Sequence, residues 1–181
     1  MDFLEVLLTR RSVRSYSSKA IDSKVLRTVL DAARMAPSAN NVQPWRFIVV
    51  SDDNKRKAIA RISANQSFIA EAPVILVCCG KRYVDRWSWL EKNMYLVDTA
   101  IAIDHLALAA RNQGLGTCWI GAFDHEDLKN LLKVPDGFDI IVLIPLGYPA
   151  RPELFHETSS RKPLDEIIFA ETFGNSSAEI L

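Results

Sequence analysis

Four groups that can hold an anion fall within five residues near the start of the chain. Arg10, Arg11 and Arg14 carry guanidinium groups, and Ser12 carries a hydroxyl. A phosphate monoester binds where several charge-assisted donors converge, and the paired N–H groups of arginine match the arrangement of its oxygens. This spacing indicates a phosphate site. The alternative is a solvated basic patch that offsets the negative end of a preceding helix.

A polar loop at residues 37–45 is the second candidate. Between its two prolines it carries the side-chain amides and hydroxyls of Ser38, Asn40, Asn41 and Gln43. These groups both donate and accept hydrogen bonds, as the alternating N–H and C=O groups on the edge of a flavin ring require. Together with the phosphate site, the loop indicates flavin mononucleotide (FMN). The alternative is an ordinary connection whose amides bond their own backbone.

Two further segments carry weaker signals. Residues 114–121 hold three glycines, but their spacing does not match G-x-G-x-x-G and they follow a predicted helix, so we exclude a dinucleotide site of that kind. One interpretation is that the glycines let backbone N–H groups approach a ring. The alternative is that Gly114 ends the helix and a strand follows. Arg161, beside Lys162, is a second basic spot that could complete a phosphate shell.

Arg82, Trp87 and Trp89 form an aromatic and basic stretch before the longest predicted helix. Such side chains would either cover a ring-shaped substrate or pack as a surface loop. The sequence leaves both interpretations open.

Apolar runs predict the strands that must position these groups. Residues 47–50, 74–79 and 140–144 are continuous, β-branched and of strand length, and the last run lies within a strand from 138 to 147. Continuous apolar runs are typical of central strands that are buried on both faces. Cys78 and Cys79 should therefore point to opposite faces, as small hydrophobic side chains.

Periodicity and capping residues predict the helices. Asp2, with Glu5 three positions later, resembles a capping box, and Asp22 and Asp124 should begin helices that run to Pro37 and to residue 132. Residues 54–62 should form a short helix, and 65–70 a turn or a further helical piece. Residues 91–113, ended by Gly114, are apolar almost all round, which predicts a helix at the centre of the fold or at a subunit interface.

Bulk composition excludes several classes of protein. The 181 residues suit one domain, and 22 basic against 22 acidic residues provide no overall field for nucleic acid or an anionic membrane. The chain has no signal-like start and no apolar run long enough for a membrane helix, so we expect a cytoplasmic protein. The histidines and cysteines lack metal-ligand spacing, so we assign no metal.

Four motifs in register resemble the nitroreductase family of FMN enzymes. They are residues 10–14, 37–45, 114–121, and 147–149 with 161–164, and the similarity runs from position 3 to about 168. The resemblance implies an α+β fold with a mainly antiparallel central sheet flanked by helices. It also implies a single FMN-binding domain over residues 1–181, with about 170–181 as a tail, and an intertwined homodimer with two flavins at its interface.

The resemblance also assigns residues to the flavin. Arg10, Ser12, Arg14 and Arg161 would hold the phosphate, and Arg11 would lie along the ring's edge or the ribityl chain. Pro37, Ser38, Ala39 and Asn41 would reach the flavin from the partner subunit. Asn65 would bond the pyrimidine edge, and Trp119, Ile120 and Gly121 would lie along the ring.

The implied activity is FMN-dependent NAD(P)H oxidoreduction of nitroaromatics, quinones or similar flat aromatic acceptors by a ping-pong mechanism. The cofactor supplies the hydride chemistry, so no catalytic side chain is assigned. NADH and NADPH both remain open as reductant, and nothing in the sequence identifies one acceptor. The alternatives are a specialised FMN enzyme such as a reductive dehalogenase, and a non-catalytic flavin-binding protein.

Overall fold

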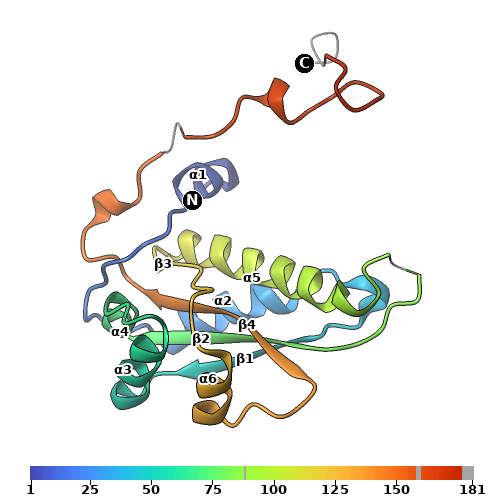
Figure 1. Cartoon of the computed structure of the whole chain (residues 1–181). Helices are drawn as coiled ribbons and strands as arrows, with labels where there is room; N and C mark the ends of the chain where they lie inside the picture. The colour runs from blue at the N-terminus through green and yellow to red at the C-terminus, as the bar shows by residue number, and fades with distance from the viewer. Residues whose placement is uncertain (88, 158–159, 177–181) are drawn as a thin grey trace.

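The computed structural model describes residues 1–87, 89–157 and 160–176 and is built around one antiparallel sheet (Figure 1). In this part of the chain the sheet has four strands in the order β1-β2-β4-β3. They are β1 (Trp45–Val50), β2 (Val74–Lys81), β3 (Gly116–Thr117) and β4 (Phe138–Gly147). Every pairing is antiparallel. The predicted α+β fold with a mainly antiparallel sheet is confirmed.

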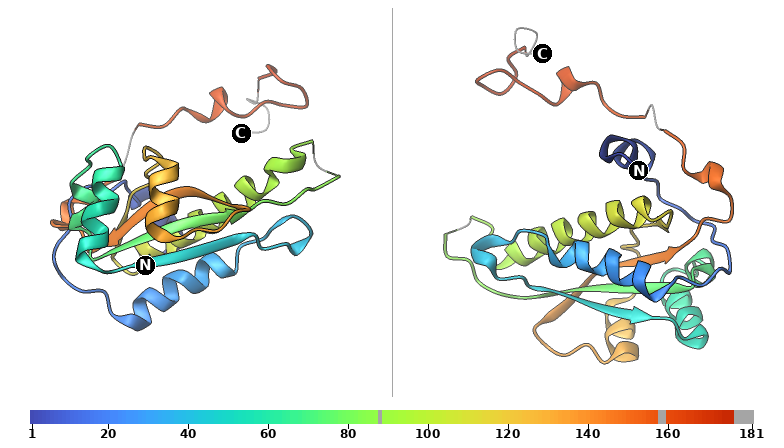
Figure 2. Two further views of the ribbon diagram at one scale, coloured as in Figure 1. Left: turned by 60° about the horizontal axis from the view of Figure 1, so that its bottom comes forward. Right: turned by 180° about the vertical axis from the view of Figure 1, so that it is seen from behind.

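Helices cover both faces of the sheet. On one face lie α2 (Ser23–Arg34) and α5 (Met94–Asn112); on the other lie α3 (Asp53–Ile62), α4 (Phe68–Glu71) and α6 (His125–Leu132) (Figures 1 and 2). Because side chains alternate along a strand, Cys78 belongs to the first core and Cys79 to the second. The predicted burial on both faces is confirmed for β2. It is wrong for β1, because β1 is an edge strand and Val49 is exposed.

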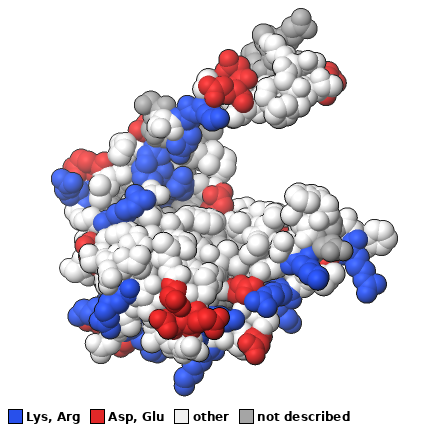
Figure 3. Space-filling model, viewed as in Figure 1, with Lys and Arg blue, Asp and Glu red and all other residues white. Residues whose placement is uncertain are grey.

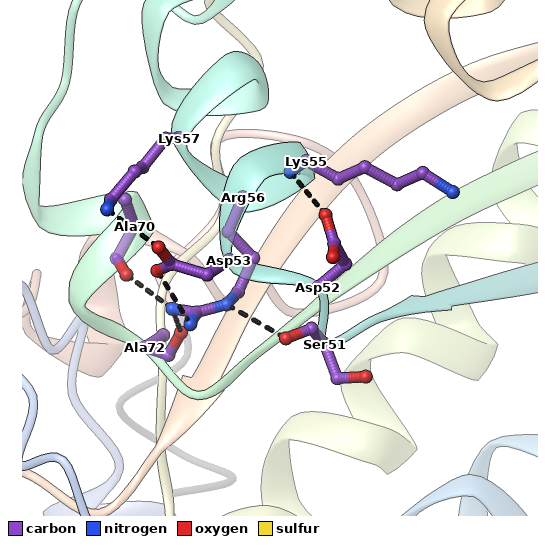
Figure 4. Close-up of polar contacts among 8 residues, drawn as sticks. All are labelled: Ser51, Asp52, Asp53, Lys55, Arg56, Lys57, Ala70 and Ala72. Carbon is purple, nitrogen blue, oxygen red and sulfur yellow. Dashed lines mark hydrogen bonds and ion pairs between the residues drawn. The ribbon is translucent and has the colours of Figure 1, made fainter.

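Aspartates begin three of the helices as helix N-caps. Asp22 accepts a hydrogen bond from the Lys24 N–H, and Asp124 accepts one from the Asp127 N–H. Asp52 does the same for α3, where Asp53 also pairs with Arg56 and Lys57 (Figure 4). These side chains satisfy N–H groups that have no partner within the helix.

The capping box predicted for α1 (Phe3–Thr9) is wrong. Asp2 stands at the N-cap with extended dihedral angles, but its side chain makes no capping hydrogen bond. The first turn of α1 is exposed, so water can satisfy its N–H groups.

The long helix α5 follows a 3₁₀ turn at Glu91–Asn93, and its predicted end is confirmed. Gly114 has a φ of 74°, and the Leu115 N–H returns to the Ala110 carbonyl at 2.8 Å, which closes the helix. One side of α5 is buried against the sheet, whereas Leu96 and Val97 stay exposed on the other. Of residues 65–70, only those from Phe68 onward are helical.

After β4 the chain leaves the sheet. It contains two 3₁₀ turns, η3 (Pro152–Leu154) and η4 (Leu164–Glu166), and extends away from the body of the molecule (Figures 1 and 2). None of the helices that the structure describes is long and apolar enough to cross a bilayer.

Candidate functional site

The segment after α1 lies against β3. Ser12 pairs with Thr117 as a parallel bridge, and the Val13 N–H donates to the Thr117 carbonyl at 2.9 Å. Gly116 allows this approach, because a Cβ atom at that position would lie 2.6 Å from a methyl carbon of Val13. The glycine of this motif therefore serves close packing between two segments of the chain.

Tyr16 anchors the other end of the segment. Its buried hydroxyl donates to the Val13 carbonyl at 2.7 Å and lies 3.2 Å from the Pro145 carbonyl, while its N–H donates to Glu71. Burial raises the pKa of Tyr16 well above its ordinary value, so the phenol stays a hydrogen-bond donor. The backbone that carries Ser12 and Arg14 is thus fixed on both sides.

A cavity of about 300 Å³ opens beside this segment. It is lined by Arg10, Arg11, Ser12, Val13, Arg14, Leu154, His156 and Arg161. Figure 3 shows Lys and Arg side chains gathered where the C-terminal tail leaves the body. The structure thus brings Arg161, remote in sequence, to the same cavity as the N-terminal arginines.

Arg11 has both satisfied and unsatisfied hydrogen-bond donors beside the cavity. Its Nη1 donates to the Arg10 carbonyl and its Nη2 to the Leu8 carbonyl, so it partly serves the end of α1, as the alternative interpretation expects. Its Nε is buried and has no hydrogen-bond partner among the described residues. Burial, followed by repulsion from Arg161 and Arg10, lowers the pKa of Arg11. An anion in the cavity would relieve this repulsion.

The residues expected beside the ring lie at the same end of the molecule. Trp119 is partly exposed, Ile120 is buried and bridges Leu143, and a Cβ at Gly121 would contact nothing within 4 Å. The Asp124 N–H donates to the Ile62 carbonyl, which ties the end of this segment to α3.

Asn65 lies in the turn after α3. It is exposed, has a φ of 56° and lines a separate cavity of about 280 Å³. Arg56 holds this turn from within α3, because its guanidinium donates to the carbonyls of Ala70 and Ala72 (Figure 4). Asn65 is therefore positioned near the sheet edge but does not line the arginine cavity.

The loop of residues 37–45 uses part of its polar groups internally. The Gln43 N–H donates to Ser38 Oγ at 2.9 Å, and the Gln43 side-chain amide donates to Asn41 Oδ1 at 2.9 Å. This agrees with the local-bonding alternative for these two pairs. The Ala39 N–H instead donates at 3.0 Å to the buried carboxylate of Asp98 on α5.

Within one chain, the loop and the arginine cavity lie far apart. The loop is bonded to Asp98 near the start of α5, whereas Thr9, which precedes the arginines, is bonded to Arg111 near its end. At 1.5 Å per helical residue, these two attachment points are about 20 Å apart. Figures 1 and 2 show the two segments at opposite ends of the molecule. A single chain does not bring them to one ligand.

Arg82, Trp87 and Trp89, which could cover a ring-shaped substrate, have two different environments. Trp87 and Trp89 are 93% and 90% exposed, so neither packs on this chain. Arg82 forms a salt bridge with Asp139 on β4 instead of reaching over a ring. Ser88, between the tryptophans, lies outside the described residues.

Sequence reasoning missed four residues that shape this region: Tyr16, Asp98, Arg111 and His156. Tyr16, Asp98 and Arg111 contact residues distant in the chain, so periodicity gives no signal for them. Proximity to Arg161 was the one available hint for His156. No group of three or more His, Cys, Asp or Glu side chains suited to a metal occurs in the described ranges.

Comparisons with known proteins identify the family of this chain. The sequence model of the nitroreductase family matches residues 7–81 and 64–148, so the chain belongs to the nitroreductase family. The crystal structure of a nitroreductase family protein from Clostridium novyi NT is 34% identical, with a TM-score of 0.76, over 99% of this chain and 98% of that one.

Two relatives carry names that state an activity. The "FMN reductase (NADPH)" of Bacillus subtilis is 26% identical over 81% of this chain and 66% of its own length. The "Iodotyrosine dehalogenase 1 homolog" of Caenorhabditis elegans is 29% identical over 91% of this chain and 60% of its own length.

Proposed function

We propose that this protein is an FMN-dependent NAD(P)H oxidoreductase that reduces nitroaromatics, quinones or similar flat acceptors. The observation that carries the proposal is the arginine cavity, in which Arg11 Nε is buried without a partner among the described residues, and burial, followed by repulsion from Arg161 and Arg10, lowers the Arg11 pKa. Such a cavity fits the dianionic phosphate of FMN. Membership of the nitroreductase family and the name of the Bacillus subtilis relative support the choice of flavin and reductant.

Arg10, Ser12, Arg14 and Arg161 would hold the phosphate, and Arg11 would offer its free Nε to the phosphate or the ribityl chain. Trp119, Ile120, Gly121 and Asn65 would lie beside the ring. FMN supplies hydride transfer from a nicotinamide to an acceptor, and the protein orients it and sets its electrostatics. The guanidiniums place positive charge beside the cofactor, which favours forms that carry negative charge.

The working unit would be a homodimer. The loop that carries Pro37, Ser38, Ala39 and Asn41 is attached to α5 about 20 Å from the point where the arginine segment is attached, so these residues could complete a site only in a second copy. The outward face of α1 exposes Phe3, Leu4, Leu7 and Leu8. This apolar face adjoins a cavity of about 710 Å³ between α1, α2 and α5. Such a surface is typical of a face that another subunit covers.

An absorbance spectrum tests the proposal. We expect the purified protein to be yellow with bound FMN, and anaerobic NADH or NADPH to bleach it. Addition of a nitroaromatic or quinone should restore the colour. Yellow protein that neither nicotinamide bleaches would indicate a non-catalytic flavin-binding protein, and protein that takes up no FMN would refute the proposal. Parallel steady-state lines for varied NADPH and acceptor are expected; intersecting lines would exclude the ping-pong cycle.

Reductive dehalogenation is a second candidate, favoured by the Caenorhabditis elegans relative. It uses the same flavin site with a different acceptor. An anaerobic assay with halogenated phenols distinguishes it, because halide release at rates above those of quinone reduction would support dehalogenation.

A further inference from the structure

Arg111, near the end of α5, contacts both walls of the arginine cavity from behind. Its Nε donates to Thr9 Oγ1 at 2.9 Å, and Thr9 directly precedes Arg10. Its guanidinium carbon lies 4.1 Å from the centroid of the Phe155 ring, and Phe155 stands between Leu154 and His156, which line the cavity. One side chain therefore connects the N-terminal wall with the C-terminal wall.

The surroundings of Arg111 are unusual for a buried cation. The residue is 8% exposed, and no carboxylate lies within salt-bridge distance of it in the described part of the chain. Burial lowers its pKa. Burying a charge without a salt bridge is costly, and the aromatic ring, one hydroxyl and the more distant charge of Glu5 compensate for this only in part. A methionine or leucine would fill the same space without that cost, so simple packing does not account for an arginine.

The two walls are linked first by an antiparallel bridge between Tyr16 and Pro149. Leu154 and Phe155 also pack against the apolar cluster that contains Tyr16. The N-terminal wall is held on β3 through Val13, and the C-terminal wall follows β4 and contains only the short turn η3. Phe155 has a single described polar contact of its own, from its N–H to the Pro152 carbonyl within that turn. The stack on Arg111 adds to these links a contact directly beside His156 on one wall and Arg10 on the other.

We propose that Arg111 is a positioning residue for phosphate binding, which holds Phe155, and with it the adjacent His156, across the cavity from Arg10 and Arg14. The inference rests on the assignment of this cavity to the phosphate of FMN. Arg111 acts through Thr9 and Phe155 and does not itself line the cavity. Its loss should therefore weaken recognition of the phosphate and leave recognition of the ring intact.

The test compares the dissociation constants of FMN and riboflavin, which differ only in the phosphate. The variants are Arg111→Met, which keeps the apolar stem, Arg111→Lys, which keeps the cation over the ring, and Phe155→Leu, which removes the ring. Arg34→Met is the matched control, since Arg34 is an exposed arginine on α2 that pairs with Asp31. Flavin fluorescence during titration of the apoprotein provides the measurement.

We expect Arg111→Met and Phe155→Leu to weaken FMN binding about tenfold, the scale of one lost charge-assisted contact, with riboflavin changed less than twofold. Arg111→Lys should recover part of the loss, and Arg34→Met should bind both flavins as the parent does. Equal weakening of FMN and riboflavin, or unchanged FMN binding by a folded Arg111→Met protein, would overturn the inference. If Arg111→Met does not fold, Phe155→Leu and Arg111→Lys decide by the same comparison.

A parent protein that binds neither flavin would refute the proposed function, and the role of Arg111 in holding a phosphate is then tested separately. Inorganic phosphate is then the probe, because it reports on the cavity whatever the larger ligand is. Phosphate should raise the Tm of the parent and of Arg34→Met more than that of Arg111→Met. Equal shifts in all three proteins would count against a positioning role.

Discussion

Gly116→Ala should destabilise the protein, although the same change at an unconstrained position stabilises. The φ of Gly116 is not in the left-handed region, so alanine meets no backbone strain there. A glycine-to-alanine change in such a conformation gains about 0.4–1 kcal/mol by restricting the unfolded chain. At Gly116, however, the new Cβ would lie 2.6 Å and 2.7 Å from Cγ2 and Cβ of Val13.

The steric cost outweighs this gain. Val13 Cβ is fixed to the backbone, and that backbone is bonded to Thr117 and Tyr16, so the contact cannot be relieved by a rotamer change. Overpacking a buried contact costs about 1–3 kcal/mol. The net loss is then about 1–2 kcal/mol, which corresponds to a decrease in Tm of roughly 2–8 °C for a chain of this size.

Urea unfolding and FMN titration provide the assay. Because the displaced segment carries Ser12 and Arg14, we expect FMN binding to weaken together with stability. Gly121→Ala is the control for stability alone: it introduces a Cβ with no atom within 4 Å, and its φ is also outside the left-handed region. That variant should be as stable as the parent or slightly more so. A Gly116→Ala protein with unchanged unfolding free energy and unchanged FMN affinity would show that this contact does not position the arginines.

Three further outcomes are expected. Arg14→Ala should remove a charge-assisted contact with phosphate worth roughly 1.5–3 kcal/mol. FMN titrations should then show binding weakened about 10- to 150-fold in a protein that remains folded. An unchanged dissociation constant would contradict the placement of Arg14 at the phosphate. Arg82 lowers the pKa of Asp139 from 3.8 to about 2, so this pair stabilises the fold above pH 4 and loses its effect as the pH falls toward 2. Asp139→Asn should lower the free energy of unfolding in urea by about 1 kcal/mol at pH 7 and by less at pH 3, and a difference independent of pH would exclude the ion pair as its source. Leu108→Asp places a carboxylate in the apolar cavity beside α1. Because that charge would be unpaired in an interface, the variant should be a monomer by light scattering and should lack the flavin colour. A yellow dimer would show that this part of α5 does not lie in the interface.

Local sequence features predicted most of the fold. The apolar run at 74–79 and the caps at Asp22 and Asp124 depend on neighbours in the chain, so their periodicity and side-chain chemistry were sufficient. The prediction of a capping box at Asp2 was wrong, because water can satisfy the N–H groups of an exposed first turn without a side-chain cap. The sequence also predicted an anion site at residues 10–14, because four donors within five residues can converge on an anion whatever the rest of the fold is.

Tertiary structure alone decided how those pieces combine. The sequence determined that residues 10–14 could bind a phosphate, but the contact of Gly116 with Val13 and the stack of Arg111 on Phe155 depend on segments distant in the chain. The distance that α5 places between the polar loop and the arginines likewise exists only in the folded molecule. Local patterns report which backbone conformation a segment adopts, whereas packing between segments determines which side chains share a cavity.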